Sequence, residues 1–220
     1  KILKYFGEAK KHWGYDKNLM LAIKRFYWSL NEVDNVQSVL FEMIENQDHD
    51  TTTLCSYIYS KGFDNDWSQK DFFSFSKFLQ KHTTYFEPTD MINFKLNNTN
   101  KIKLGFVSGD LRSNHSVTYF LKTVLLNYDK NNFEIYLYFN HEKDDEITEN
   151  FKKMVFKSKN ISDLNDIDAI NFIRSDGIDI SFDLMGVTSS HREVLFKNRI
   201  APIQINWIGY CNTVGLIGND

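Results

Sequence analysis

"IKLGFVSGDLRSNHSVTYFL", residues 102–121, contains a strand pattern followed at once by a helix pattern. Its first part, 102–108, is a short apolar run typical of a strand. Val117, Phe120 and Leu121 then follow at helical spacing. The polar joint between the two patterns contains His115, which is therefore expected where a strand gives way to a helix.

The same alternation continues through the rest of the chain. Strand patterns occur at 132–140, 178–186 and 203–210. Helical patterns cover 115–128, 145–156, 166–177 and 189–199. Strands that alternate with helices predict parallel β-α-β units, and such sheets bind ligands at the carboxyl ends of their strands. Three stretches are therefore expected on one rim: Ser108–Ser116, Asp183–Ser190 and Gly209–Gly215.

Residues 1–86 have a different character, because their apolar pattern is helical throughout. We expect four or so helices there, including one with an N-cap at Asp50 or Thr51 and a stop at Gly62. The region could end a helical-repeat array, although no clean period is visible. Residues 87–101 are polar and predict a linker to the α/β region, 102–220.

Composition excludes several classes of protein. Hydrophobic residues make up 42% of the chain, as in a globular protein, and the net charge of −3 argues against a general nucleic-acid binder. Cys55 and Cys211 are far apart, which suggests neither a disulfide framework nor a zinc knuckle. With no long apolar run and no leader-like start, we expect a soluble cytoplasmic protein that does not bind membranes.

The first rim loop lacks both the dinucleotide fingerprint and the P-loop pattern. The helix that follows can still bind an anion through its free N–H groups and its dipole. That dipole disfavours an imidazolium, so His115 is expected to be neutral near neutral pH. An ordinary capping role for His115 stays open.

The other two loops carry small and hydroxylated residues. Gly186 permits a tight turn or the close approach of a ligand. Gly209, Asn212, Thr213 and Gly215 suit a phosphate or a sugar, and are equally ordinary turn residues.

Three segments, "LGFVSGDLRSNHSVTYFL", "DGIDISFDLMGVTSSHREVLF" and "APIQINWIGYCNTVG", resemble the catalytic region of the O-linked N-acetylglucosamine transferases and their SPINDLY-type relatives, glycosyltransferase family 41. The resemblance covers residues 102–215. The helices of 1–86 are only loosely similar to those that join the family's tetratricopeptide array to its catalytic part.

The resemblance implies an α/β fold in which a helical region precedes a Rossmann-like parallel sheet, the first half of a GT-B glycosyltransferase. It implies transfer of a sugar, with N-acetylglucosamine the leading donor group, from a UDP-sugar to Ser or Thr of acceptor proteins. Transfer would be inverting and metal-independent, without a cofactor. The second half of the catalytic domain would follow, so the isolated chain is expected to be inactive.

The family's motifs transfer to individual positions of this sequence. The resemblance makes His115 the catalytic candidate. It makes the following residues donor-binding candidates, with no metal ligand: Ser116, Val117, Gly186, Gly209, Tyr210 and Thr213.

The sequence departs from the family pattern at four positions. Cys211 and Asn212 replace a Pro-Gly pair, and Asn212 could adopt the positive φ of the glycine. Val187 stands where bacterial relatives often have histidine, and Ser76 where a second family histidine is expected. These departures support an alternative: a non-catalytic helical scaffold that binds proteins and retains a degenerate transferase site.

Two further features have ordinary explanations. Arg192 resembles a recurrent family arginine, but a helix-surface position or a structural pair with Asp183 explains it equally well. The acidic run 143–146 is expected to be solvated surface and not a metal motif. A dehydrogenase of the same fold class is disfavoured because its glycine fingerprint is absent.

Overall fold

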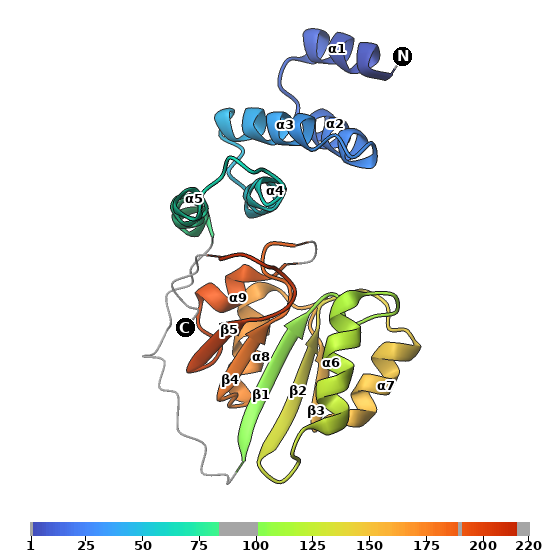
Figure 1. Ribbon diagram of the computed structural model, residues 1–220, viewed down its shortest axis with the longest axis vertical. Helices are drawn as coiled ribbons and strands as arrows, with labels where there is room; N and C mark the ends of the chain where they lie inside the picture. The colour runs from blue at the N-terminus through green and yellow to red at the C-terminus, as the bar shows by residue number, and fades with distance from the viewer. Residues whose placement is uncertain (1, 84–100, 189–190, 215–220) are drawn as a thin grey trace. The chain divides into compact units, whose positions relative to one another are not determined.

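A computed structural model describes residues 2–83, 101–188 and 191–214. The chain forms two compact units, and the boundary between them in the sequence falls between His82 and Thr83 (Figure 1). The expected linker, 87–101, lies almost entirely outside the described residues. No helix in the described part of the chain is long and apolar enough to cross a bilayer.

The first unit is helical, as expected. Its helices are α1 (Ile2–Trp13), α2 (Lys17–Ser29), α3 (Val33–Glu45), α4 (Thr51–Lys61) and α5 (Gln69–His82). The Asp50 carboxylate accepts the N–H of Thr53 and caps α4, and Gly62 follows its last turn, so both predicted boundaries are confirmed. Helix α1 is an addition to the expected set, and no residue within it is buried.

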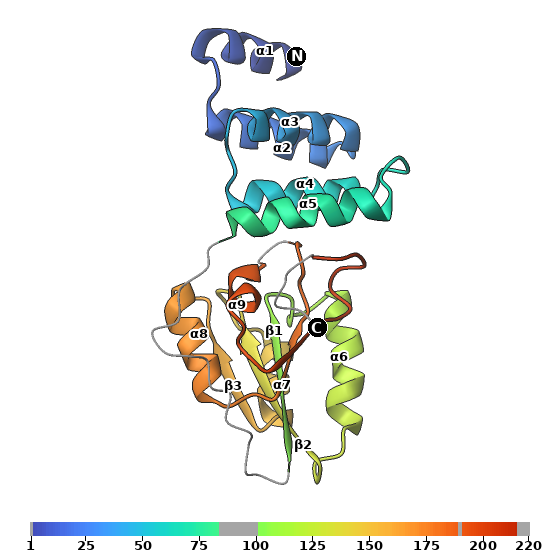
Figure 2. The same ribbon diagram turned by 90° about the vertical axis from the view of Figure 1, so that its left-hand side faces the viewer.

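Helices α2 to α5 are arranged as two successive pairs (Figure 2). Helix α2 begins at residue 17 and α4 at residue 51, 34 residues later, which is the length of a tetratricopeptide repeat. The two helix pairs are separated by the length of one repeat, but their sequences have no obvious pattern in common. One core cluster is built mainly from α2 and α3, with Met20, Val36, Leu40 and Met43 buried, and α4 and α5 bury further apolar residues such as Leu54, Ile58 and Leu79.

The second unit is a five-stranded parallel sheet in the order β3-β2-β1-β4-β5. The strands are β1 (Ile102–Ser108), β2 (Phe133–Phe139), β3 (Lys157–Asn160), β4 (Ile180–Asp183) and β5 (Ile203–Asn206). The helices are α6 (Ser116–Asn127), α7 (Glu146–Met154), α8 (Asp166–Ser175) and α9 (Glu193–Lys197). The predicted fold class, helices followed by a Rossmann-like parallel sheet, is confirmed.

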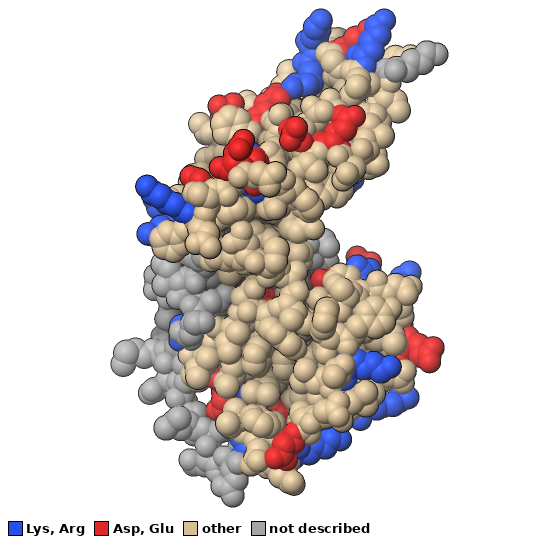
Figure 3. All heavy atoms as spheres, viewed as in Figure 1, with Lys and Arg blue, Asp and Glu red and all other residues tan. Residues whose placement is uncertain are grey.

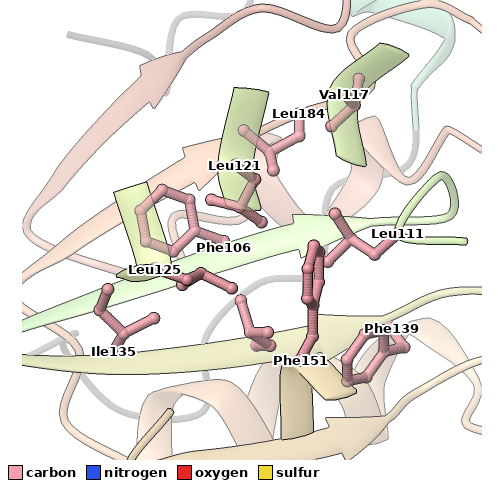
Figure 4. Packing of buried hydrophobic residues seen from close by; sticks show 10 residues of the cluster. Phe106, Leu111, Val117, Leu121, Leu125, Ile135, Phe139, Phe151 and Leu184 are labelled. Carbon is pink, nitrogen blue, oxygen red and sulfur yellow. The ribbon is translucent and has the colours of Figure 1, made fainter. Parts of the chain in front are cut away.

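Helices cover both faces of this sheet, and α6 and α8 lie on opposite sides (Figure 2). On one face, Val117, Leu121 and Leu125 of α6 pack against strand residues such as Phe106, and Phe151 of α7 joins them (Figure 4). Leu111 and Leu184 belong to the same cluster, although each lies just beyond a strand. The core therefore anchors the two loops that these leucines begin.

Charged side chains of both signs are interspersed on the face of the second unit seen in Figure 3. They lie mainly along its edges, and the middle of this face is largely uncharged. This face therefore presents no patch of a single sign.

Candidate functional site

Strands β1 and β4 are neighbours in the middle of the sheet, and their crossovers run in opposite directions, to β2 and to β5. This is the topological switch point at which open α/β sheets form a crevice. The loops that leave the two strands meet there, because the N–H of Gly109 lies 3.0 Å from the sulfur of Met185.

The backbone of the loop after β1 is held by hydrogen bonds to two side-chain hydroxyls, those of Ser108 and Thr118. The amide of Asp110 donates to the Ser108 hydroxyl at 2.9 Å. The hydroxyl of Thr118, in the first turn of α6, lies 3.0 and 2.8 Å from the carbonyl oxygens of Asp110 and Arg112. Asn114 takes the positive φ of 60° that closes the loop, a conformation that asparagine tolerates well. The loop therefore holds the next residue, His115, in a defined position.

His115 occupies the N-cap position of α6 in an extended conformation, yet its side chain makes no capping bond. Its ring turns instead towards Asp110, with Nε2 3.5 Å from Oδ1. The side chain is 34% exposed, and its Nδ1 is buried without a hydrogen-bond partner among the described residues. The side chain of His115 therefore does not cap helix α6.

Asp110 lies almost wholly inside the protein, with 4% of its side chain exposed. Burial raises the pKa of its carboxyl, an effect that the neighbouring His115, Arg112 and His141 offset only in part. Among the described residues, Asp110 is the one acidic side chain within 4 Å of a His115 ring nitrogen.

The loop after β4 forms a tight turn around Asp183. Its buried carboxylate accepts the N–H groups of Met185 and Gly186, at 2.9 and 3.1 Å. Gly186 has a φ of 59°, and an added Cβ would lie 2.5 Å from the Cβ of Tyr210. The glycine is needed for both the turn and the close packing of the third loop.

The loop after β5 packs against the second loop through another glycine. A Cβ on Gly209 would lie 1.7 Å from the carbonyl oxygen of Leu184, so only glycine fits there. The expectation that Asn212 adopts a positive φ is wrong, because in this loop the positive value belongs to Ile208. The amide oxygen of Asn212 instead accepts the N–H of Thr213.

The donor-binding candidates thus divide into two groups. Gly186, Gly209 and Tyr210 lie together at the junction of the second and third loops, where Gly186 and Tyr210 are buried and Gly209 is half-buried. Ser116 and Thr213 are exposed, whereas the Val117 side chain belongs to the core and leaves only its backbone for a ligand.

Arg192 does not pair with Asp183, as one alternative proposed. Its guanidinium binds the Asp166 carboxylate at 2.7 Å and the carbonyl oxygen of Ile161 at 2.9 Å, with further bonds to Asn140 and Leu164. These partners follow β2 and β3 or begin α8. Arg192 is therefore a structural clamp: it connects the segments that follow β2 and β3 to the start of α8.

Two features of the rim were missed by reading the sequence. His141 lies two residues after the end of β2, has 9% of its side chain exposed, and places Nε2 3.4 Å from both Asp144 and Thr148. Asp145, within the acidic run taken as solvated surface, caps α7 and also accepts the N–H of Ser113 at 2.6 Å. The position of both residues just after a predicted strand was the available signal.

The two remaining departures lie in different units. Val187 is buried in the second rim loop. Ser76 belongs to α5 in the helical unit, where its hydroxyl is buried and has no hydrogen-bond partner in the described residues. His82, at the end of the same helix, packs its ring edge-on against His49 and at a tilt against Phe78.

Comparison with known proteins finds relatives among the glycosyltransferases that the sequence motifs resemble. A family described as "Glycosyl transferase family 41" matches residues 74–218. A probable UDP-N-acetylglucosamine–peptide N-acetylglucosaminyltransferase SPINDLY from Oryza sativa is 35% identical over 117 residues, which are 51% of this chain and 12% of that protein. The Eustoma exaltatum protein of the same description is 32% identical over 155 residues, or 69% of this chain and 15% of the relative.

A Caenorhabditis elegans UDP-N-acetylglucosamine–peptide N-acetylglucosaminyltransferase is 31% identical over 127 residues, 56% of this chain and 11% of its own length. Among solved structures, a mutant of the Thermobaculum terrenum O-GlcNAc transferase shares the fold, with a TM-score of 0.85 and 21% identity. The match covers 98% of this chain and 41% of that one. The chain thus corresponds to a small part of the curated relatives and less than half of the solved one.

Proposed function

The chain belongs to glycosyltransferase family 41, and from that premise we propose that it forms one half of the catalytic domain of a protein O-glycosyltransferase. The donor is UDP-N-acetylglucosamine, and the acceptors are Ser or Thr hydroxyls of proteins or peptides. Transfer inverts the anomeric centre and uses neither a metal nor a cofactor. The relatives named above are peptide N-acetylglucosaminyltransferases, which supports this choice of donor and acceptor.

One observation carries the proposal: the N-terminus of α6 opens at the β1–β4 switch point with a partly exposed histidine beside it. Glycosyl transfer must stabilise the negative charge that develops on the departing diphosphate. The first N–H groups of a helix have no acceptor within the helix and lie at the positive end of its dipole. The amides of Ser116 and Val117 are such groups, and they can receive diphosphate oxygens without a metal ion.

The site also needs a group that holds the acceptor hydroxyl in line with the bond that breaks. His115 lies next to these amides and is the candidate for that task or for a phosphate contact. Gly186, Gly209 and Tyr210 lie where the second and third loops pack against each other. Thr213, in the third loop, supplies an exposed hydroxyl.

The scaffold alternative has specific observations in its favour. Val187 places a buried apolar side chain where bacterial relatives often carry histidine, and Ser76 replaces another histidine. If these histidines are required for turnover, the chain keeps the fold and binds partners without transferring sugar.

An assay of sugar transfer separates the two functions. The full-length protein is incubated with labelled UDP-N-acetylglucosamine and acceptor peptides, with and without a chelator. We expect transfer that the chelator does not inhibit, and a fall in kcat of roughly 10²- to 10⁴-fold in His115→Ala, the range of a positioned catalytic side chain. His12→Ala, which removes an exposed histidine of α1, is the matched control. No transfer by folded wild-type protein supports the scaffold instead.

A further inference from the structure

We propose that the helical unit carries a docking surface for an extended acidic peptide, formed by neighbouring faces of α2 and α4. The peptide that fits it has one carboxylate side chain and one bulky apolar side chain, two positions apart. The docking surface consists of Lys24, Arg25, Trp28, Ser56, Tyr59 and Phe63. Such docking does not require that the chain transfers sugar.

Three aromatic rings lie in contact on this surface, one from α2, one from α4 and one from the turn after α4. The centroid of the Trp28 ring lies 6.0 Å from that of Tyr59 and 6.1 Å from that of Phe63. Trp28 is nevertheless 42% exposed, and Phe63 is 59% exposed. Aromatic side chains are enriched in protein interfaces, and tryptophan and tyrosine are frequent hot spots of binding. The rings therefore offer a contact for a bulky apolar side chain.

Two adjacent cations, Lys24 and Arg25, lie about one helical turn from these rings. Neither forms an ion pair with the described residues, whereas three other lysines of this unit each pair with a carboxylate. Lys24 is half-buried, and its ammonium reaches only the Ser56 hydroxyl, at 3.4 Å. Burial and the charge of Arg25 lower the pKa of Lys24, and Asp50 offsets this only in part. A carboxylate from a partner would supply the counter-charge that Lys24 lacks.

Acidic side chains in the segments around the docking surface are bound elsewhere. Asp50 caps α4 and pairs with a lysine at the start of α2. Asp64, which follows Phe63, pairs with the last lysine of α4 at 2.8 Å. Glu32, after α2, accepts a hydrogen bond from the amide of Asn35. The charges of Lys24 and its neighbouring arginine are therefore free to attract an incoming carboxylate.

The spacing of these groups matches the spacing along an extended peptide. Lys24 and Trp28 are four residues apart in α2, so their side chains share a face and their Cβ atoms lie about 5–6 Å apart. Ser56 and Tyr59 lie beside them on α4. In an extended chain, side chains two positions apart point to the same side and lie about 7 Å apart. One carboxylate can thus reach Lys24 while an apolar side chain covers Trp28.

NMR titration of the ¹⁵N-labelled 220-residue chain tests this surface, because the indole N–H signal of Trp28 reports on it directly. The probes are acetyl-Gly-Ser-Asp-Ser-Phe-Ser-Gly-amide and the peptide of reversed order, which cover both chain directions. We expect at least one of them to shift the Trp28 signal in a saturable way. The signal of Trp13, which is 66% exposed on α1, is the internal control and should not move. Replacing the aspartate of the peptide by asparagine should weaken binding roughly three- to tenfold, as loss of a charged hydrogen-bond partner does.

A charge swap separates this contact from general electrostatic attraction. Lys24→Glu should weaken binding of the aspartate peptide roughly tenfold and strengthen binding of a peptide with lysine in its place. Lys11→Glu, at an exposed lysine of α1, is the matched control and should bind as the wild type does.

Three results would overturn the proposal. They are no saturable shift of Trp28 with either aspartate peptide, an equal shift of Trp13, and an affinity that Lys24→Glu leaves unchanged. If Lys24→Glu does not fold, the comparison of aspartate and asparagine peptides on the wild-type chain decides the question, and equal affinities refute the role of the lysine.

Discussion

Asp183 shows how a single buried carboxyl sets a pH dependence. Burial raises its pKa to about 6, although the N–H groups of Met185 and Gly186 favour the charged form. The folded protein therefore keeps a proton that the unfolded chain loses above about pH 4. Stability attributable to this group is present below that pH and falls as the pH rises towards 6.

Asp183→Asn keeps an oxygen for both N–H groups and removes the titration. Between about pH 4 and 7, the free energy of unfolding of the wild type should fall by up to about 3 kcal/mol more than that of Asp183→Asn. Urea unfolding at several pH values measures the difference. The neighbouring pair of His191 and Glu193 is common to both proteins. Identical pH profiles would show that Asp183 titrates normally.

Arg192 is expected to matter for stability and not for chemistry. Its fork of donors reaches a carboxylate and several backbone carbonyls at once, which a lysine cannot do. Arg192→Lys should cost roughly 2 kcal/mol, about one for each hydrogen bond that is not replaced. Arg112→Lys, at an exposed arginine, should change stability by less than about 0.5 kcal/mol. Equal effects in urea unfolding would refute the clamp.

The residues of the site were predictable only in part. His115 was found because a strand pattern and a helix pattern meet at it. The position of Asp110 beside His115 depends on the curvature of the loop, which the local sequence pattern does not reveal. The positive φ expected at Asn212 occurs instead at Ile208, a β-branched residue that local rules exclude. The packing of Gly209 on Leu184 joins this loop to the loop after β4, and such a contact between distant segments could not be read from the sequence.

Among the elements, helix α7 connects the acidic run to the first rim loop. Asp145 caps the helix through Thr148 and binds the N–H of Ser113 with its second oxygen. Asp145→Ala should therefore cost about 1 kcal/mol, as cap losses do, and should speed amide hydrogen exchange across 109–115.

Asn165→Ala is the matched control, because Asn165 caps α8 through Asp168 and, within the described part of the chain, forms no hydrogen bond with that loop. It should lower stability by a similar amount without changing exchange in 109–115. If the two variants alter exchange in that loop equally, the link between α7 and the loop is absent.

The elements that sequence reading missed have weak patterns of their own. Strand β3 consists of "KSKN", a short polar edge strand with neither alternation nor branched residues. Helix α1 buries none of its residues, so its apolar positions do not mark an interior face. The strands β1, β2, β4 and β5 lie within apolar segments and were all expected.

At the scale of the whole molecule, the order of helices and strands carries the fold. The family match, residues 74–218, covers nearly all of the second unit and only the end of the helical unit. The chain spans 11–15% of the curated relatives, so activity belongs to the larger protein and stays a proposal. What this chain itself supplies is the β1–β4 rim with the N-terminus of α6. The central claim is that these backbone amides receive the diphosphate.

Calorimetric titration of UDP into the full-length protein tests that claim most directly, with Ser116→Pro as the variant. Proline fits the first position of a helix and removes one N–H, and the extended His115 before it accepts a proline neighbour. Glu146→Pro, at the first position of α7, is the control. We predict that Ser116→Pro weakens UDP binding roughly tenfold, as the loss of a hydrogen bond to a charged group would, and that Glu146→Pro does not. Equal binding by both variants, or no binding of UDP to the folded wild-type protein, would contradict the account.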